Sequence, residues 1–232
     1  MGLKYINLIL YTSKGCICMK KLKELFKKYN HAWVLLYALI YMPWFTYLER
    51  HVTAAFYLIH SPLDDYIPFV EYFIVPYLLW FVYLAAGACF LFFKDKKGFL
   101  QAARFAISGM TIFLIICTIF PNGLALRPTI FAHDNVFVDL VKIVYSTDTP
   151  TNVLPSMHVF LSVGMCMALN RTPALKDKHG IRIAAGILSF IIVLSTMFLK
   201  QPAALVMDGI LYQLVYARQA RQARKLMHEP VI

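Results

Sequence analysis

Residues 72–93 have the sequence YFIVPYLLWFVYLAAGACFLFF, a run without a single charged side chain. About 20 apolar residues in a helix are enough to cross the hydrocarbon core of a bilayer. Backbone amides cannot stay unpaired in hydrocarbon, so a segment of this kind must be helical there. The run therefore predicts a membrane-spanning helix and sets the class of the chain.

The remaining sequence has the same character. Of the 232 residues, 60% are hydrophobic and 15% are charged, whereas soluble domains average about 45–50% and about 25%. The predicted fold class is an all-α, polytopic membrane bundle in one domain, 32–217, between a basic N-terminal segment, 1–31, and a basic tail, 218–232. We expect six transmembrane helices, at about 32–48, 66–93, 105–120, 156–169, 181–199 and 203–217.

The cations of the chain are distributed unequally between the loops. The N-terminal segment, the second-to-third loop, the fourth-to-fifth loop and the tail together hold 19 of the 23 Lys and Arg residues. Cytoplasmic loops carry such an excess, so the pattern predicts a cell-membrane protein with both termini in the cytoplasm. The net charge of +11 is explained by this topology, and we expect no nucleic-acid partner. Four cations are expected on the outer side: Arg50, Arg127, Lys142 and Lys200.

Residues 1–18 and the cysteines carry weaker signals. The apolar run at 5–11 is too short to span a bilayer and lacks a small-residue cleavage site. Met19 begins Met-Lys-Lys-Leu-Lys, a natural start, so 1–18 also fits an over-extended reading frame.

The five cysteines are odd in number and form no ligand cluster. We therefore expect neither a disulfide framework nor a metal or other cofactor.

Four ionisable residues are candidates for a functional site, because charges near a bilayer are costly and usually serve a function. They are Arg127, His158, Lys200 and Asp208, all predicted to be at the outer side. Ser156 is a good N-cap for the helix that follows, and a helix N-terminus attracts anions. His158 would then act on a bound phosphate as an acid or base, with the two cations neutralising its oxygens.

Each of these signals also has an ordinary interpretation. A histidine in a membrane helix often has only a structural hydrogen bond, an outer arginine is often only solvated, and Pro-Ser is a common helix start. The phosphate-site prediction therefore depends on the convergence of all of them on one side.

Three stretches resemble the motifs of the type 2 phosphatidic acid phosphatase superfamily, in particular the branch of inositol phosphoceramide synthases and bacterial lipid phosphatases. They are Leu126-Arg127-Pro128, Pro155-Ser156-Met157-His158 and Ser195 to Asp208. The resemblance covers roughly 30–217. It implies a metal-independent phosphatase or phosphotransferase that acts on a lipid phosphate at the extracytoplasmic side through a phosphohistidine. It also implies that Arg127 binds phosphate, Ser156 donates a hydrogen bond to it, His158 is the general acid and Asp208 orients the nucleophile.

The chain departs from that pattern in three places. Phe120 stands where the first motif usually has a lysine, and Met157 replaces a common glycine. The third motif is degenerate: after Lys200 the nucleophilic histidine is missing, Pro202 lies near its place, and no histidine occurs between His179 and His228.

Three interpretations of the missing nucleophile stay open. The chain is an inactive relative, its sequence contains a local error near Pro202, or His158 activates water or Asp208 attacks directly. The alternative function is a non-catalytic membrane protein that binds lipid headgroups. A small transporter is disfavoured, because no internal repeat or paired broken helices are evident. For the enzyme and for the headgroup-binding protein alike, the expected partners are a lipid phosphate and membrane lipids.

Overall fold

The structure is a computed structural model that describes residue 24 and residues 29–51, 57–60 and 62–199. The chain divides into two compact units, Met1–Tyr37 and Ala38–Ile232. The described part of the first unit includes a 3-10 helix, η1 (Asn30–Tyr37). Helices account for 76% of the described residues, and this confirms that the chain is mostly helical.

The second unit consists of long helices joined by short elements. Two of these elements are strands that pair in parallel, with Tyr57 opposite Asn122 and Leu58 opposite Gly123. In chain order the elements are α2 (Ala38–His51), β1 (Tyr57–Leu58), α3 (Pro62–Tyr66), η2 (Glu71–Phe73), α4 (Ile74–Lys94), α5 (Lys96–Ile119), β2 (Asn122–Gly123), α6 (Val136–Thr147), α7 (Met157–Arg171), η3 (Pro173–Leu175) and α8 (His179–Phe198).

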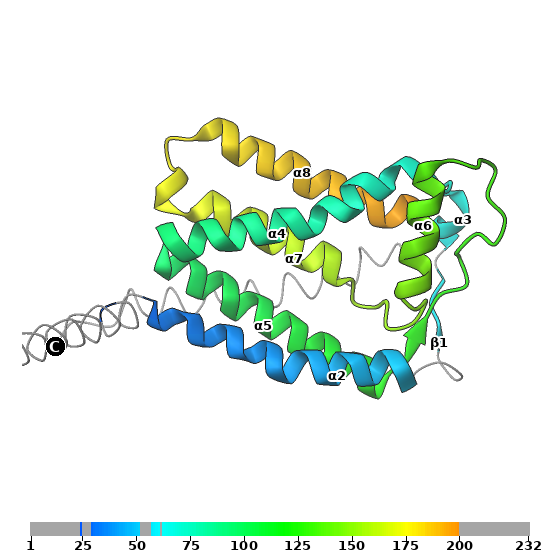
Figure 1. Ribbon diagram of the computed structural model, residues 1–232, viewed down its shortest axis with the longest axis horizontal. Helices are drawn as coiled ribbons and strands as arrows, with labels where there is room; N and C mark the ends of the chain where they lie inside the picture. Colours follow the sequence, from blue (N-terminus) through cyan, green and yellow to red (C-terminus); the bar gives the residue numbers. More distant parts are fainter. Residues whose placement is uncertain (1–23, 25–28, 52–56, 61, 200–232) are drawn as a thin grey trace, which may run out of the picture. The chain divides into compact units, whose positions relative to one another are not determined.

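Helix α7 is the central helix of the second unit. It packs against α4, α5 and α8, while α2 packs against α5 (Figure 1). Helix α6 runs across the ends of the long helices and contacts η2 and α4. The start of α7, the end of α8 and the whole of α6 therefore lie at the same end of the bundle.

Three helical segments in the described part of the chain are long and apolar enough to cross a membrane. They are Glu71–Lys94, Lys96–Ile119 and His179–Phe198, and they match the second, third and fifth predicted spans. Helices α2 and α7 lie at the first and fourth predicted spans but have 14 and 15 residues. The sixth predicted span, 203–217, lies outside the described residues, so six spans and cytoplasmic termini stay predictions.

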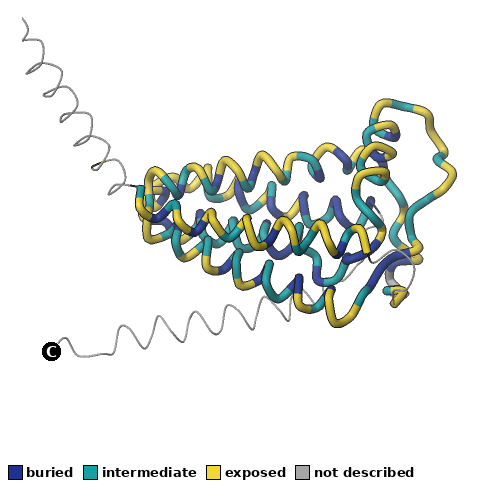
Figure 2. Tube along the Cα trace, turned by 60° about the horizontal axis from the view of Figure 1, so that its bottom comes forward, coloured by how far each residue is buried: buried dark blue, intermediate teal, exposed yellow. Residues whose placement is uncertain are grey.

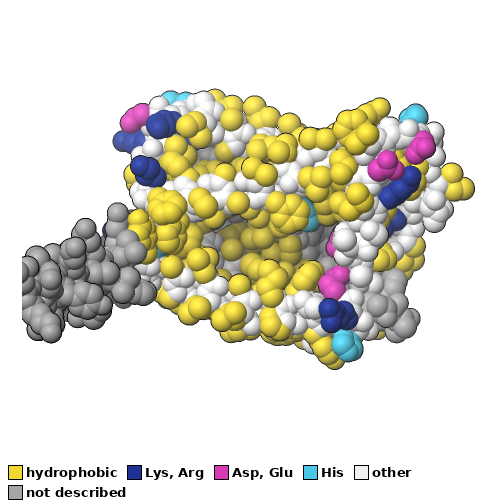
Figure 3. Space-filling model, viewed as in Figure 1, with side chains coloured by type: hydrophobic (Ala, Val, Ile, Leu, Met, Phe, Trp, Pro, Cys, Tyr) yellow, Lys and Arg dark blue, Asp and Glu magenta, His cyan; other side chains and the backbone are white. Residues whose placement is uncertain are grey.

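The outward surface of the long helices is apolar. Leu39 is 72% exposed and Phe190 is 63% exposed, and hydrophobic side chains cover the band between the two charged ends of the helices (Figure 3). Exposed and buried positions alternate along each helix (Figure 2). A large exposed apolar surface indicates contact with something other than water. Together with helix length, it supports the membrane class.

The helix boundaries differ from the predicted ones where polar residues continue a helix or interrupt it. Helix α5 begins at Lys96 rather than near Phe105, because Asp95 caps it by accepting a hydrogen bond from the Gly98 amide at 2.9 Å. Helix α4 begins at Ile74, and Tyr66 instead ends the separate helix α3. The predicted outer loop also contains α6, which sequence analysis did not predict.

Glycines let the central helices approach one another closely. A methyl group on Gly109 of α5 would overlap the ring of Phe160 of α7, and one on Gly164 of α7 would overlap Phe105 of α5. The two rings are stacked with their centroids 4.3 Å apart. Small residues at helix contacts are typical of membrane bundles, where close packing replaces the hydrophobic effect.

We expect Gly109→Ala to lower the free energy of unfolding by about 1–3 kcal/mol, because the stacked Phe160 ring has no free space to move into. Gly87→Ala should cost less, since the new methyl group would meet the flexible Met165 side chain. In the described part of the chain nothing lies within 4 Å of a methyl group placed on Gly186, so Gly186→Ala is the matched control and should be neutral or stabilising. Denaturation in detergent micelles measures all three. Equal values for Gly109→Ala and Gly186→Ala would contradict the close packing.

Candidate functional site

His158 lies in the first turn of α7, where the sequence predicted a helix start. Ser156 is the N-cap, and its hydroxyl accepts a hydrogen bond from the Val159 amide at 3.4 Å. The first amides of a helix have no partner inside the helix, and the helix dipole makes this end positive. The predicted Ser156 cap is confirmed, and it places the His158 side chain beside an anion-attracting helix end.

The imidazole of His158 packs into aromatic side chains of α4. Its ring centroid lies 4.5 Å from that of Tyr77 and 4.1 Å from that of Trp80. The Nε2 atom of His158 and the Nε1 atom of Trp80 are both buried, and neither has a hydrogen-bond partner in the described part of the chain. Leaving a buried polar atom unpaired costs about 1–3 kcal/mol. Two such atoms therefore lie on neighbouring rings of α4 and α7.

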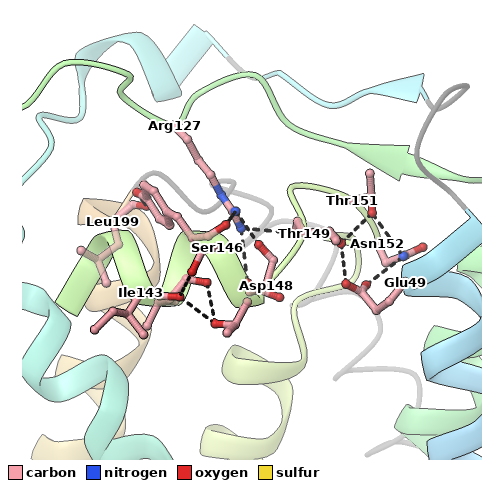
Figure 4. A network of polar contacts seen from close by, with 12 residues as sticks. Glu49, Arg127, Ile143, Ser146, Asp148, Thr149, Thr151, Asn152 and Leu199 are labelled. Carbon is pink, nitrogen blue, oxygen red and sulfur yellow. Dashed lines mark hydrogen bonds and ion pairs between the residues drawn. The ribbon is translucent and has the colours of Figure 1, made fainter. Parts of the chain in front are cut away.

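Arg127 is held by the C-terminal end of α6 rather than standing free. Its side chain is 12% exposed. The guanidinium donates to the carbonyl of Asp148 at 2.6 Å, to that of Thr149 at 3.2 Å and to that of Tyr145 at 3.3 Å, and it pairs with the Asp148 carboxylate at 3.3 Å (Figure 4). These carbonyls follow the last turn of a helix, where a cation is favourable. The Nε atom of Arg127 is buried and has no hydrogen-bond partner within the described ranges.

Tyr145 connects this arginine to the end of α8. Its ring lies under the Arg127 guanidinium at 4.5 Å, and its hydroxyl donates to the carbonyl of Leu199 at 2.7 Å. Burial raises the pKa of Tyr145 to about 12, although the nearby Arg127 lowers it, so the phenol keeps its proton at neutral pH. Tyr145 thus connects the first predicted motif to the start of the third. Lys200 and Asp208, the predicted site residues of that third motif, lie outside the described residues.

Asn122 holds the loop that precedes α7. Its side chain is fully buried. The amide group donates to the carbonyls of Phe120 at 3.0 Å and Leu154 at 3.1 Å. Its oxygen accepts from the amides of Val153 at 3.0 Å and Leu154 at 2.8 Å. Every donor and acceptor position of this side chain is therefore used to fix the chain just before Ser156.

Glu49 of α2 holds the preceding part of the same loop. Its carboxylate accepts hydrogen bonds from the Thr149 hydroxyl and, at 2.9 Å, from the side-chain amide of Asn152 (Figure 4). Asn152 has a φ of 55°, a conformation that asparagine tolerates better than most residues. A cleft of about 370 Å³, lined in part by Glu49, Arg50 and Asp148, opens beside this network.

Sequence reasoning missed both Glu49 and Asn122. Glu49 did offer a signal, because an acid at the end of an apolar segment needs a partner. Asn122 offered none, since the segment that it holds before α7, Val153 and Leu154, is more than 30 residues away in the sequence.

Histidines and acids elsewhere in the second unit pair among themselves. His133 bonds the buried Glu71 at 2.9 Å, and His60 bonds Asp65 at 2.9 Å. Within the described ranges, no three His, Cys, Asp or Glu side chains gather as metal ligands would. No family model, curated protein or solved structure matches the chain.

Proposed function

We propose that the chain is a membrane protein that holds the phosphate of a lipid at the end of the bundle where α7 begins, as a phosphatase-like or phosphotransferase-like protein of the type 2 phosphatidic acid phosphatase superfamily. The observation that carries this proposal is the buried Nε2 of His158, which has no hydrogen-bond partner among the described residues, beside the Nε1 of Trp80, which has none there either. Ser156 caps the same helix end, where amides and dipole favour an anion. In this proposal the site faces the extracytoplasmic side, as the charge asymmetry predicts.

In this proposal His158 is the general acid. Protonated Nε2 would donate to a phosphate-ester oxygen and pass its proton to the alcohol as the ester bond breaks. The rings of Tyr77 and Trp80 hold the imidazole in one orientation, so little reorganisation is needed. The bond to phosphorus requires a nucleophile, and the resemblance places it near Pro202, outside the described residues.

A specific observation favours the second candidate, a non-catalytic protein that binds lipid headgroups. Among the described residues of the second unit, the other histidines are His51, His60 and His133 with their own partners, and His179 at the start of α8. None of them is bonded or stacked to His158 in the described structure, so no second histidine is shown beside the phosphate position. Binding without turnover is therefore the form of the proposal that needs the fewest further residues.

Metal-free phosphate release from phosphatidic acid and isoprenyl pyrophosphate in proteoliposomes tests the catalytic form. We expect the natural chain to release little phosphate, Pro202→His to release at least tenfold more, and His158→Ala to abolish that gain in the double variant. His133→Ala is the matched control, because that side chain is 67% exposed on an outer segment. Release by Pro202→His that is unaffected by His158→Ala would contradict the role of His158.

A further inference from the structure

A second groove lies between α5 and α7, at the opposite end of α7 from His158. It has a volume of about 270 Å³. Arg171, which lines it, is 13 residues from His158 in the same helix, or roughly 20 Å at 1.5 Å per residue. The groove is therefore separate from the proposed phosphate site, and the inference does not rest on the proposed function.

The groove has a charged end and an apolar floor. Lys97, in the first turn of α5, and Arg171, at the end of α7, are both exposed and line it. Further along the helices it is lined by Ala102 and Phe105 of α5 and by Gly164 of α7. Two cations at the helix ends thus adjoin apolar side chains that line the rest of the groove.

Asp95 fixes the charged end of the groove. One carboxylate oxygen accepts from the Gly98 amide at 2.9 Å, and the other accepts from the hydroxyl of the buried Thr172 at 2.7 Å. These bonds join the start of α5 to the residue that follows α7. Asp95 thus braces the two walls and keeps its negative charge, so Lys97, Arg171 and Asp95 together leave this end of the groove with a net positive charge.

The floor of the groove is closely packed because of a glycine. Gly164 faces the Phe105 ring, and a side chain in its place would overlap that ring. Phe105 is also stacked on Phe160. The floor of the groove is therefore a closely packed apolar surface.

We propose that this groove binds one anionic phospholipid, with its phosphate between Lys97 and Arg171 and an acyl chain along the Phe105–Gly164 floor. Charge complementarity favours an anionic headgroup, and the apolar floor favours a lipid over a free anion. The groove lies at the end of the bundle where the predicted cytoplasmic cations gather, and anionic lipids are concentrated in the cytoplasmic leaflet.

A thermal unfolding experiment tests this proposal. Dioleoyl phosphatidylglycerol is added to the purified protein in neutral detergent, and the shift in the unfolding midpoint is measured. We expect a rise for the natural chain and none for the Lys97→Gln/Arg171→Gln double variant, whose apparent Kd should be at least tenfold weaker. Lys176→Gln/Lys178→Gln is the matched control, since both residues are exposed in the loop after α7 but do not line the groove. Ala168→Leu keeps both cations and fills part of the groove that Ala168 lines, and it should also lose the response.

Three results would overturn the proposal. An equal loss in the Lys176/Lys178 control would assign the effect to diffuse surface charge. Equal stabilisation by glycerol phosphate, which has the headgroup but no acyl chain, or an unchanged response of Ala168→Leu, would show that the site takes a simple anion. Zwitterionic phosphatidylcholine should stabilise none of the variants by this route.

Discussion

Asn122→Ala should lower the free energy of unfolding by about 3–5 kcal/mol, the largest effect we expect from any single substitution in the described part of the chain. The substitution removes two accepted and two donated hydrogen bonds at a fully buried position. The amides of Val153 and Leu154 and the carbonyl of Phe120 would be left without these partners. Each unpaired buried group costs about 1–3 kcal/mol, so the combined effect is near the top of the range for point mutations.

We call the four hydrogen bonds of the Asn122 side chain the Asn122 clamp. The substitution Asn122→Asp separates its accepting half from its donating half. A carboxylate still accepts from the Val153 and Leu154 amides but donates nothing to the two carbonyls, so this variant should also be strongly destabilised. Asn170→Ala is the matched control, because its side-chain amide bonds Cys166 within α7 and its oxygen accepts from Arg182. That change should cost about 1 kcal/mol. Denaturation in mixed micelles measures the free energy of unfolding of both variants. Similar values for Asn122→Ala and Asn170→Ala would rule out the clamp.

Arg127→Ala should cost about 2–4 kcal/mol even in the absence of any phosphate. The guanidinium is the shared donor for three carbonyls at the end of α6 and the partner of the Asp148 carboxylate. Arg127→Lys should recover less than half of the loss, because an ammonium group is a point charge and cannot reproduce the planar fork of arginine.

Lys142→Ala provides the control for Arg127→Ala. Lys142 is half-exposed and pairs with the exposed Asp134 and Asp139, and such surface pairs contribute about 0–1 kcal/mol. Micelle denaturation without added lipid or phosphate is the measurement. If Arg127→Ala were no less stable than Lys142→Ala, Arg127 would have no structural role at α6, and its predicted role as a free phosphate ligand would gain support.

Sequence alone predicted the parts of the fold that depend on continuous apolar runs. Helices α4, α5 and α8 follow from such runs, and the start of α7 follows from Pro155 and Ser156. Helix α6 was missed because its apolar side is narrow: Val138 and Val141 are buried, whereas Val136 and Ile143 are exposed. A short helix of this kind, lying across the bundle, leaves no long hydrophobic run to detect.

The candidate site was predictable only in part, for a physical reason. The importance of His158 follows from the cost of a polar group in an apolar helix, and the sequence shows that directly. The aromatic packing of His158 and the clamp at Asn122 instead depend on contacts between distant segments. Arg127 shows the limit most clearly, since its charge indicated a ligand but the fold uses most of its donors to hold α6.

The most direct test of the account is the affinity of the purified protein for dioctanoyl phosphatidic acid, measured by calorimetry in neutral detergent with a metal chelator present. His158→Phe keeps a ring between Tyr77 and Trp80 but removes Nε2, so the variant should fold. It should bind the lipid roughly 10–100-fold more weakly, because a hydrogen bond to a charged group contributes about 1.5–3 kcal/mol. His133→Phe should bind as the natural chain does. Equal affinity of His158→Phe and the natural chain would contradict a phosphate site at His158.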